Sequence, residues 1–155
     1  DDLCPDEAEV INDLKDEDGC PDDLLAVRSN EAIVLLEKLY FATNRDRILR
    51  RSNPVLQALA AVLRDNPDIL QVRVEGHTDD TPIRTARFPS NWELSTNRAT
   101  NIVRFLSNHG VPARRLKAAG YADTRPVSPN RTLSGRPIPK NRSANRRVLL
   151  KIETN

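Results

Sequence analysis

Residues 53 to 76, NPVLQALAAVLRDNPDILQVRVEG, carry two periodic patterns from which the fold can be predicted. Asn53-Pro54 is typical of a helix N-cap followed by proline in the first turn, and Asn66-Pro67 stops the run. Between these signals apolar residues recur at helical spacing: Val55, Leu56, Leu59, Val62 and Leu63. The next residues alternate up to Gly76, which predicts a strand whose inward side chains are Leu70, Val72 and Val74.

A second helix is predicted to follow Ser90. Ser90 and Glu93 have the spacing of a capping box, and Gly110 is a typical stop. Between them the apolar positions are again helical: Leu94, Ala99, Ile102, Val103 and Leu106. Further strands are expected in EAIVLLEKLYF (31–41), with Ile33, Leu35, Leu39 and Phe41 on one side, in LKAAGYAD (116–123) and in NRRVLLKIE (145–153).

The element order is therefore strand, helix, strand, helix, strand, loop, strand. Each helical crossover joins strands that would naturally lie parallel, with the helices to one side. We predict an α/β sandwich of the βαβαβ type, in which one mixed sheet carries its helices on one face. The chain of 155 residues has room for one core and an appendage.

Charge divides the chain into two parts. Residues 1 to 31 hold twelve acidic and two basic residues, a net −10, and the remainder has a net +12. We therefore expect residues 1–30 to be a loop-rich acidic leader or linker, and residues 31–155 to form the domain. No run approaches the ~18 apolar residues of a membrane span, and the start does not resemble a signal peptide.

The leader holds the only cysteines, Cys4 and Cys20. Two cysteines closing a short loop favour an exported disulfide, with two unpaired thiols in a reducing compartment as the alternative. The stretch DEDGCPDD around Gly19 suggests calcium, but an EF-hand loop needs an oxygen ligand where Leu14 stands. A solvated acidic spacer is the simpler interpretation, and calcium binding at the leader stays open.

GHTDDTP (76–82) contains one of the two histidines. A zinc site is not predicted, because His109 stands at the far end of a helix of about 27 Å. Ser90, Ser95 and Thr78 lack a nucleophile-elbow pattern, and adjacent carboxylates at a strand end diverge rather than act as an acid/base pair. The simplest role for His77 is structural, with both ring nitrogens bonded to the backbone.

Asp79 would present a negative charge at the carboxyl end of its strand, where ligands of open α/β sheets collect. Asn91, Ser95 and Arg98 share one face of the second helix. Opposed Asp79 and Arg98 suit a zwitterion, since the carboxylate can take an ammonium and the guanidinium a carboxylate. An internal salt bridge between the two residues is the alternative.

Four ordered motifs, GHTDDTP, NWELSTNRA, GYADTRPVSPN and NRSANRRV, closely resemble the OmpA-like peptidoglycan-binding family. The loop that ends in FPSNWELS is most similar to the flagellar stator MotB-like members, and LYFATNRDRI is generic to the family. PIPKNRS interrupts the usual run before NRRV. The role of this insertion around residues 136–142, and the contribution of Tyr121 and Asn130 to a third wall of the site, stay open.

The resemblance implies a protein that binds the meso-diaminopimelate of uncrosslinked stem peptides without catalysis, and so anchors an envelope protein to the wall. It implies Asp79 on the ligand amine, Arg98 on its carboxylate, Thr81 and Asn91 as supporting contacts, and Arg146 or Arg147 in the same groove. No cofactor or metal is implied. The expected location is the periplasm of a Gram-negative envelope, associated with the outer membrane, while a membrane tether outside these residues and a homodimer stay open.

Three other functions are alternatives to wall anchoring by an outer-membrane-associated protein. A MotB-like stator anchor is the alternative within the family. A nucleic-acid binder is suggested by eleven bases against two acids from Arg114 onward, yet the chain lacks an aromatic stacking platform and a DNA-reading helix, so no nucleic-acid partner is predicted. A wall-peptide hydrolase using Asp79 and His77 is the third, and we expect no such activity.

Overall fold

The computed structural model describes residues 25–35 and 38–153. Cys4, Cys20 and the acidic calcium stretch lie outside the described residues, so the leader's predicted disulfide and calcium site stay predictions. The first element among the described residues is β1 (Ala26–Arg28), a strand that falls before residue 31, where the sequence predicts the domain to begin. Within the described residues, no helix is long and apolar enough to cross a membrane.

One mixed five-stranded sheet forms the back of the molecule, in the order β1-β2-β5-β3-β4. Its other strands are β2 (Ala32–Leu35), β3 (Gln71–His77), β4 (Leu116–Gly120) and β5 (Arg147–Glu153). Strands β3 and β4 are parallel, as the crossover rule predicts, and the other neighbours are antiparallel. The expected strand over 31–41 is shorter than predicted, since Phe41 forms only an isolated bridge with Ile48.

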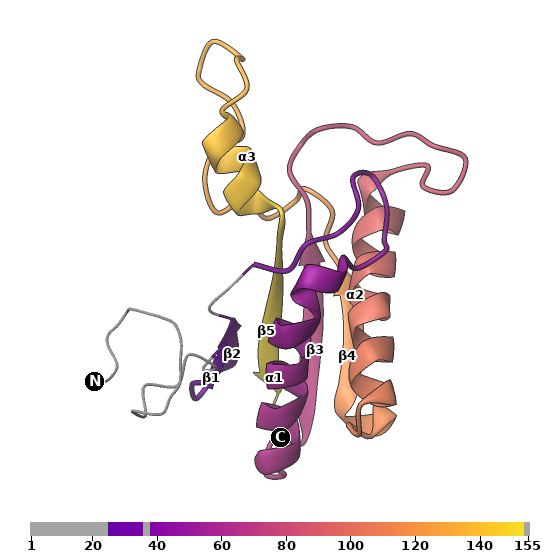
Figure 1. The fold of residues 1–155 in the computed structure, drawn as a ribbon. Helices are drawn as coiled ribbons and strands as arrows, with labels where there is room; N and C mark the ends of the chain where they lie inside the picture. The colour runs from indigo at the N-terminus through magenta and orange to yellow at the C-terminus, as the bar shows by residue number, and fades with distance from the viewer. Residues whose placement is uncertain (1–24, 36–37, 154–155) are drawn as a thin grey trace.

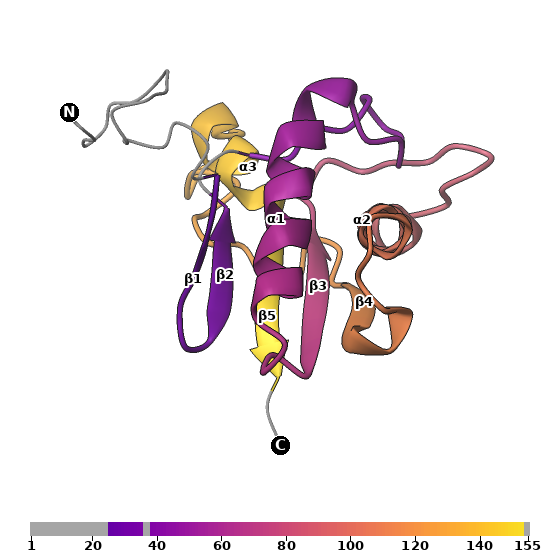
Figure 2. The same ribbon diagram turned by 60° about the horizontal axis from the view of Figure 1, so that its bottom comes forward.

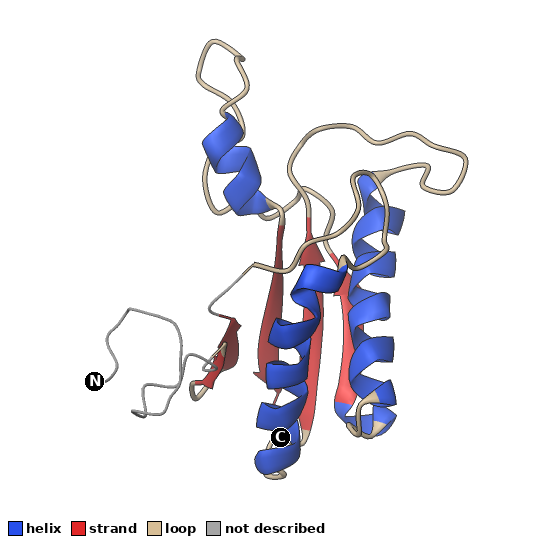
Figure 3. Cartoon of the chain, in the orientation of Figure 1, coloured by secondary structure: helices blue, strands red, loops and turns tan. Residues whose placement is uncertain are grey.

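Two long helices, α1 (Asn53–Asp65) and α2 (Asn91–Asn108), lie side by side on one face of this sheet (Figures 1 and 2). The helix and strand layers are separated clearly in Figure 3. The predicted apolar faces of the two helices meet Val72, Val74 and Leu150 of the sheet in one core, except that Leu94 packs in a separate cluster with Ile83 and Phe88. The predicted inward position of Leu70 is wrong, because Leu70 is 56% exposed and Ile69 is buried in its place.

Of the two predicted helix starts, the one of α2 agrees with the structure and the one of α1 does not. Ser90 caps α2 as predicted, accepting from the Trp92 N–H and bonding the Glu93 carboxylate. Asn53, however, is the first residue of α1 and follows a 3-10 turn (η1, Arg50–Ser52). Ser52 makes no cap, because its hydroxyl accepts from the Tyr40 N–H instead.

Gly76 and Gly120 allow α2 to lie directly on β3 and β4. A Cβ at Gly76 would overlap the backbone carbonyl of Ser95, and one at Gly120 would overlap Thr96. The close approach brings Ser95 against the loop after β4, where its hydroxyl accepts from the Ala122 N–H. The N-terminal half of α2 is thereby fixed beside the carboxyl end of β3.

The Pro- and Asn-rich segment after β4, residues 121–138 and called the excursion, leads into a third helix, α3 (Pro139–Asn145). A 3-10 turn (η2, Ala113–Arg115) precedes β4. Figure 1 shows α3 beyond the start of β5, away from the two-layer body. Asn145 is buried and joins α3 to the excursion, accepting from Val127 N–H and donating to Ser128 and Asn130. Asn130 therefore has a structural role in the excursion.

Candidate functional site

The predicted site residues come together around one cavity of about 510 Å³ at the carboxyl end of β3. Strand β3 ends at His77, and the following loop carries Asp79. Five predicted residues line the cavity: Asp79, Thr81, Asn91, Arg98 and Arg146. Arg147, the other arginine of the NRRV motif, also lines it, whereas Tyr121 and Asn130 are not among its lining residues. The third wall, which the sequence left open, is supplied by α3 and the start of β5 through Ser143, Arg146 and Arg147.

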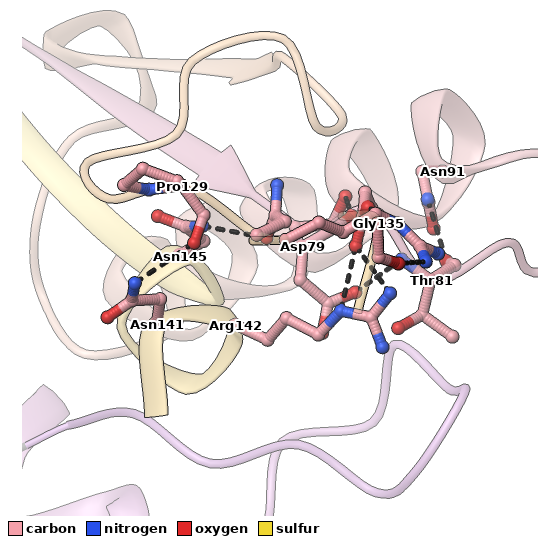
Figure 4. Close-up of polar contacts among 12 residues, drawn as sticks. Asp79, Thr81, Asn91, Pro129, Gly135, Asn141, Arg142 and Asn145 are labelled. Atoms are coloured by element: carbon pink, nitrogen blue, oxygen red, sulfur yellow. Dashed lines mark hydrogen bonds and ion pairs between the residues drawn. The ribbon is translucent and has the colours of Figure 1, made fainter. Parts of the chain in front are cut away.

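Asp79 is 5% exposed, and both of its carboxylate oxygens are engaged. Oδ1 accepts from the Thr81 N–H at 2.8 Å, and Oδ2 pairs with Arg146 Nη1 at 2.5 Å. Asn91 continues this network by donating to the Thr81 carbonyl at 3.0 Å. Figure 4 shows Asp79, Thr81 and Asn91 in this arrangement. The loop is therefore held in one conformation by residues of α2 and of the α3–β5 junction.

Arg98 lies on the α2 wall and is not bonded to Asp79. Its Nε donates to the Arg45 carbonyl at 2.8 Å, its Nη2 donates to the Ala42 carbonyl at 3.4 Å, and its guanidinium lies 4.8 Å from the centre of the Phe41 ring. These contacts position the group while leaving other N–H donors for a ligand. The alternative of a direct Asp79–Arg98 salt bridge does not hold in this structure.

The Arg98 side chain is half-buried. Burial and, to a lesser degree, the positive charge of Arg146 together lower the pKa of Arg98 to about 10, against the opposing charges of Asp46 and Asp79. Arg98 still carries its charge at neutral pH. A partly desolvated guanidinium of this kind interacts strongly with an incoming carboxylate, because less water competes for its donors.

Asp79 and Asp80 diverge, as expected for neighbours at a strand end. Asp80 accepts from Arg131 Nε and Arg142 Nε, each at 2.8 Å, and so faces the excursion and not the cavity. Burial opposes ionisation of Asp80, but the hydrogen bonds from both arginines outweigh it and lower the pKa of the carboxyl. Asp80 thus fixes α3 next to the cavity, and the two carboxylates do not form an acid/base pair.

His77 has a structural setting that differs from the predicted one. Its Nε2 lies 3.1 Å from Glu75 Oε1, a side chain and not a backbone group, while its Nδ1 is buried without a partner. The ring stacks on Tyr121 with centroids 5.3 Å apart, and Arg125 covers Tyr121. Within residues 25–35 and 38–153, no group of three or more His, Cys, Asp or Glu could hold a metal ion.

Sequence patterns missed Lys38, which lies on the wall facing α3. Its Nζ donates to the Ser143 carbonyl at 2.5 Å and to the Ser143 hydroxyl at 3.2 Å. Tyr40 and Phe41 continue this wall. The sequence predicts Lys38 to be a polar position of a strand over 31–41, whereas in the structure Lys38 follows β2 and lies outside any strand.

The sequence profile of the OmpA family matches residues 40–140. The chain belongs to the OmpA family. Motility protein B of Bacillus subtilis is 33% identical over 117 residues, which span 75% of this chain and 42% of that protein. This chain therefore matches well under half the length of that curated relative.

Solved structures give the same family relationship. The periplasmic domain of Helicobacter pylori MotB aligns with a TM-score of 0.68 and 28% identity, covering 84% of this OmpA-family chain and 78% of that one. The cell wall anchor of the T6SS from Pseudomonas aeruginosa aligns with a TM-score of 0.66 and 30% identity, covering 84% and 87%. The predicted α/β fold, with one mixed sheet and helices on one face, is confirmed.

Proposed function

We propose that this OmpA-family domain binds peptidoglycan non-covalently, through the meso-diaminopimelate of uncrosslinked stem peptides, and so anchors a cell-envelope protein to the wall. The observation that carries the proposal is a single cavity with a buried carboxylate, Asp79, on one wall and a partly desolvated guanidinium, Arg98, on another. The similarity to a protein described as a cell wall anchor supports the same function.

The ligand's free amino acid head group would lie between these two charges. Its ammonium would approach Asp79, whose oxygens have lone pairs beyond those used by Thr81 and Arg146, and its carboxylate would take the remaining donors of Arg98. Asn91 would support the loop that carries Asp79, through its bond to the Thr81 carbonyl. This arrangement matches both charges of a zwitterion.

The proposed site binds and does not react. Asp79 is held by Arg146, and His77 is directed toward Glu75, so neither is positioned as a nucleophile–base pair. We therefore assign no catalytic residue. Incubating the domain with muropeptides and finding a new fragment by mass would contradict this assignment.

The test is co-sedimentation with purified sacculi. Asp79→Ala and Arg98→Ala should each remove the protein from the pellet, and free meso-diaminopimelate should compete with the unmodified domain. Binding at a single site of this kind corresponds to a binding free energy of about −8 to −4 kcal/mol. Repetition of the ligand along the wall adds avidity. Arg104→Ala is the matched control, since Arg104 is exposed on the same helix.

Circular dichroism must show that the variants are folded. Undiminished sedimentation of both site variants would contradict the assigned site. Arg104→Ala losing as much binding as Arg98→Ala would instead indicate that general positive charge retains the domain on the wall.

We place the protein in the periplasm of a Gram-negative envelope, in association with the outer membrane. A MotB-like stator anchor is the second candidate, and the similarity to Motility protein B favours it. Grafting residues 26–153 in place of the matching part of Motility protein B tests the second candidate. Restored motility would support the stator role, and motility that stays absent despite wall binding would favour a different envelope assembly.

A further inference from the structure

The cavity holds more positive charge than a zwitterion needs. In the part of the chain that the structure describes, four cationic side chains line it, Lys38, Arg98, Arg146 and Arg147, and one carboxylate, Asp79. Arg147 is directed away by donating to the carbonyls of Asn145 and Arg125. A ligand with one ammonium and one carboxylate would leave the surplus unchanged, because its own charges cancel.

Nearby carboxylates compensate the cations unevenly. The negative charge of Asp46 acts on Arg98, and Asp46 Oδ2 also lies 3.1 Å from Arg87 Nη2. The negative charge of Glu75 acts on Arg147. Lys38 and Arg146 therefore share Asp79, and Arg146 already occupies its Oδ2. Among residues 25–35 and 38–153, no carboxylate is bonded to the Lys38 ammonium.

The Lys38 ammonium is held in place by uncharged oxygens. Its two bonds both go to Ser143, one to the carbonyl and one to the hydroxyl, which fixes the ammonium against α3 without neutralising it. Burial lowers the pKa of Lys38, as does the charge of Arg146, with Asp79 opposing. The half-buried ammonium would be stabilised by an anion placed beside it.

We propose that Lys38, positioned by Ser143, binds a second carboxylate of the ligand, namely the C-terminal carboxylate of a stem tripeptide that ends in diaminopimelate. This inference rests on the proposed function, in which Arg98 takes the carboxylate next to the free amine. A diaminopimelate at the end of a tripeptide carries one carboxylate at each end, so the two cations on separate walls match its two anions. Lys38 is then a specificity-determining residue for stem peptides with a free C-terminus at this position.

The probes are the tripeptide L-Ala-γ-D-Glu-meso-diaminopimelate and the same peptide with its C-terminal carboxylate converted to an amide. Calorimetry should show that the unmodified domain binds the free acid about tenfold more tightly than the amide, as expected for one charge-assisted contact. Lys38→Gln should bring that ratio below about twofold while affinity for the amide stays unchanged. Lys38→Arg should retain the preference.

Lys140→Gln is the matched control, because Lys140 is an exposed lysine of α3 and should keep the tenfold preference. Equal binding of both peptides by the unmodified domain would overturn the role of Lys38 and leave the proposed function intact. A Lys38→Gln variant that still discriminates would overturn it as well. If the unmodified domain binds neither peptide, this inference and the proposed function both fail.

Discussion

Arg146 Nη1 lies 2.5 Å from Asp79 Oδ2, so the residue between α3 and β5 holds the carboxylate that follows β3. The pair joins segments 67 residues apart. Asp79 is buried, whereas the Arg146 side chain is 46% exposed. The arginine therefore neutralises a charge that has lost most of its water, and it does so from the edge of the cavity.

Replacing Arg146 with alanine should destabilise the domain by about 1–2 kcal/mol, because Asp79 would keep its burial and lose its charged partner. Solvent at the exposed guanidinium keeps the cost below that of a fully buried pair. Urea unfolding measures the change. Arg136→Ala, at an exposed position of the excursion, should be within about 0.5 kcal/mol of the unmodified protein. Equal effects of both variants would contradict a specific role for the pair.

Gly76→Ala should destabilise the domain by about 3 kcal/mol, because the added methyl would overlap the Ser95 backbone carbonyl and α2 would have to move from β3. Thermal or urea unfolding measures this. Gly135→Ala is the control: Gly135 has φ +92° and nothing within 4 Å of an added Cβ, so only backbone strain of about 1 kcal/mol is expected. A smaller effect at Gly76 than at Gly135 would show that the two layers are not tightly packed.

Periodicity sufficed for the elements with long regular patterns. Helices α1 and α2 and strand β3 follow from their apolar spacing, and α2 also from its N-cap. Periodicity did not predict β1, because this strand has only three residues. It did not predict α3 either, because this short helix has one buried residue, Asn145, and no apolar stripe. The insertion of β5 between β2 and β3 also could not be predicted, because pairing between distant strands leaves no local pattern.

The site residues could be predicted where a sequence motif falls on a regular helix or at the end of a regular strand. Asp79 follows a recognisable strand, and Asn91 and Arg98 share a helix face, so their common cavity follows from the fold. Arg98 is positioned by the backbone carbonyls of Arg45 and Ala42. Because every residue has a backbone carbonyl, no sequence pattern marks these two contacts. Lys38 could not be identified either, since its partner is Ser143 in the unpredicted helix α3.

Stability should fall as the pH drops below about 6.5, the usual pKa of histidine. Burial lowers the pKa of His77, which the hydrogen bond with Glu75 only partly opposes. The unfolded chain therefore binds a proton at a higher pH than the folded protein, and His77 contributes stability that is complete above the unfolded pKa and lost below it. Burial also opposes ionisation of Glu75, yet its bonds to Arg73 and His77 lower its pKa, so its contribution is lost only in more acidic solution.

The free energy of unfolding should decrease by up to about 1 kcal/mol between about pH 7.5 and 5.5. His77→Gln should remove most of that slope, since glutamine does not titrate. His109→Gln, which replaces the other histidine at the exposed end of α2, is measured alongside as the control. Urea unfolding at several pH values measures both, and a slope that persists in His77→Gln would contradict the assignment.

Asp80→Asn should loosen α3 without unfolding the sheet. Asp80 accepts from Arg131 and Arg142, and these bonds tie the excursion to the loop after β3. A helix of seven residues is not stable by itself, so it depends on such tertiary contacts. Asparagine keeps an acceptor and loses the charge, which weakens both bonds.

Amide hydrogen exchange is the measurement, and protection across Pro139–Asn145 should fall about tenfold while protection in β3 stays unchanged. Asp123→Asn, an exposed residue of the same excursion, should change neither. Because α3 carries Ser143, the loosening should also reduce the preference for a free C-terminal carboxylate that we assign to Lys38. Unchanged exchange in α3 would mean that Asn145 and its bonds to Ser128 and Asn130 hold the helix, and that Asp80 contributes little.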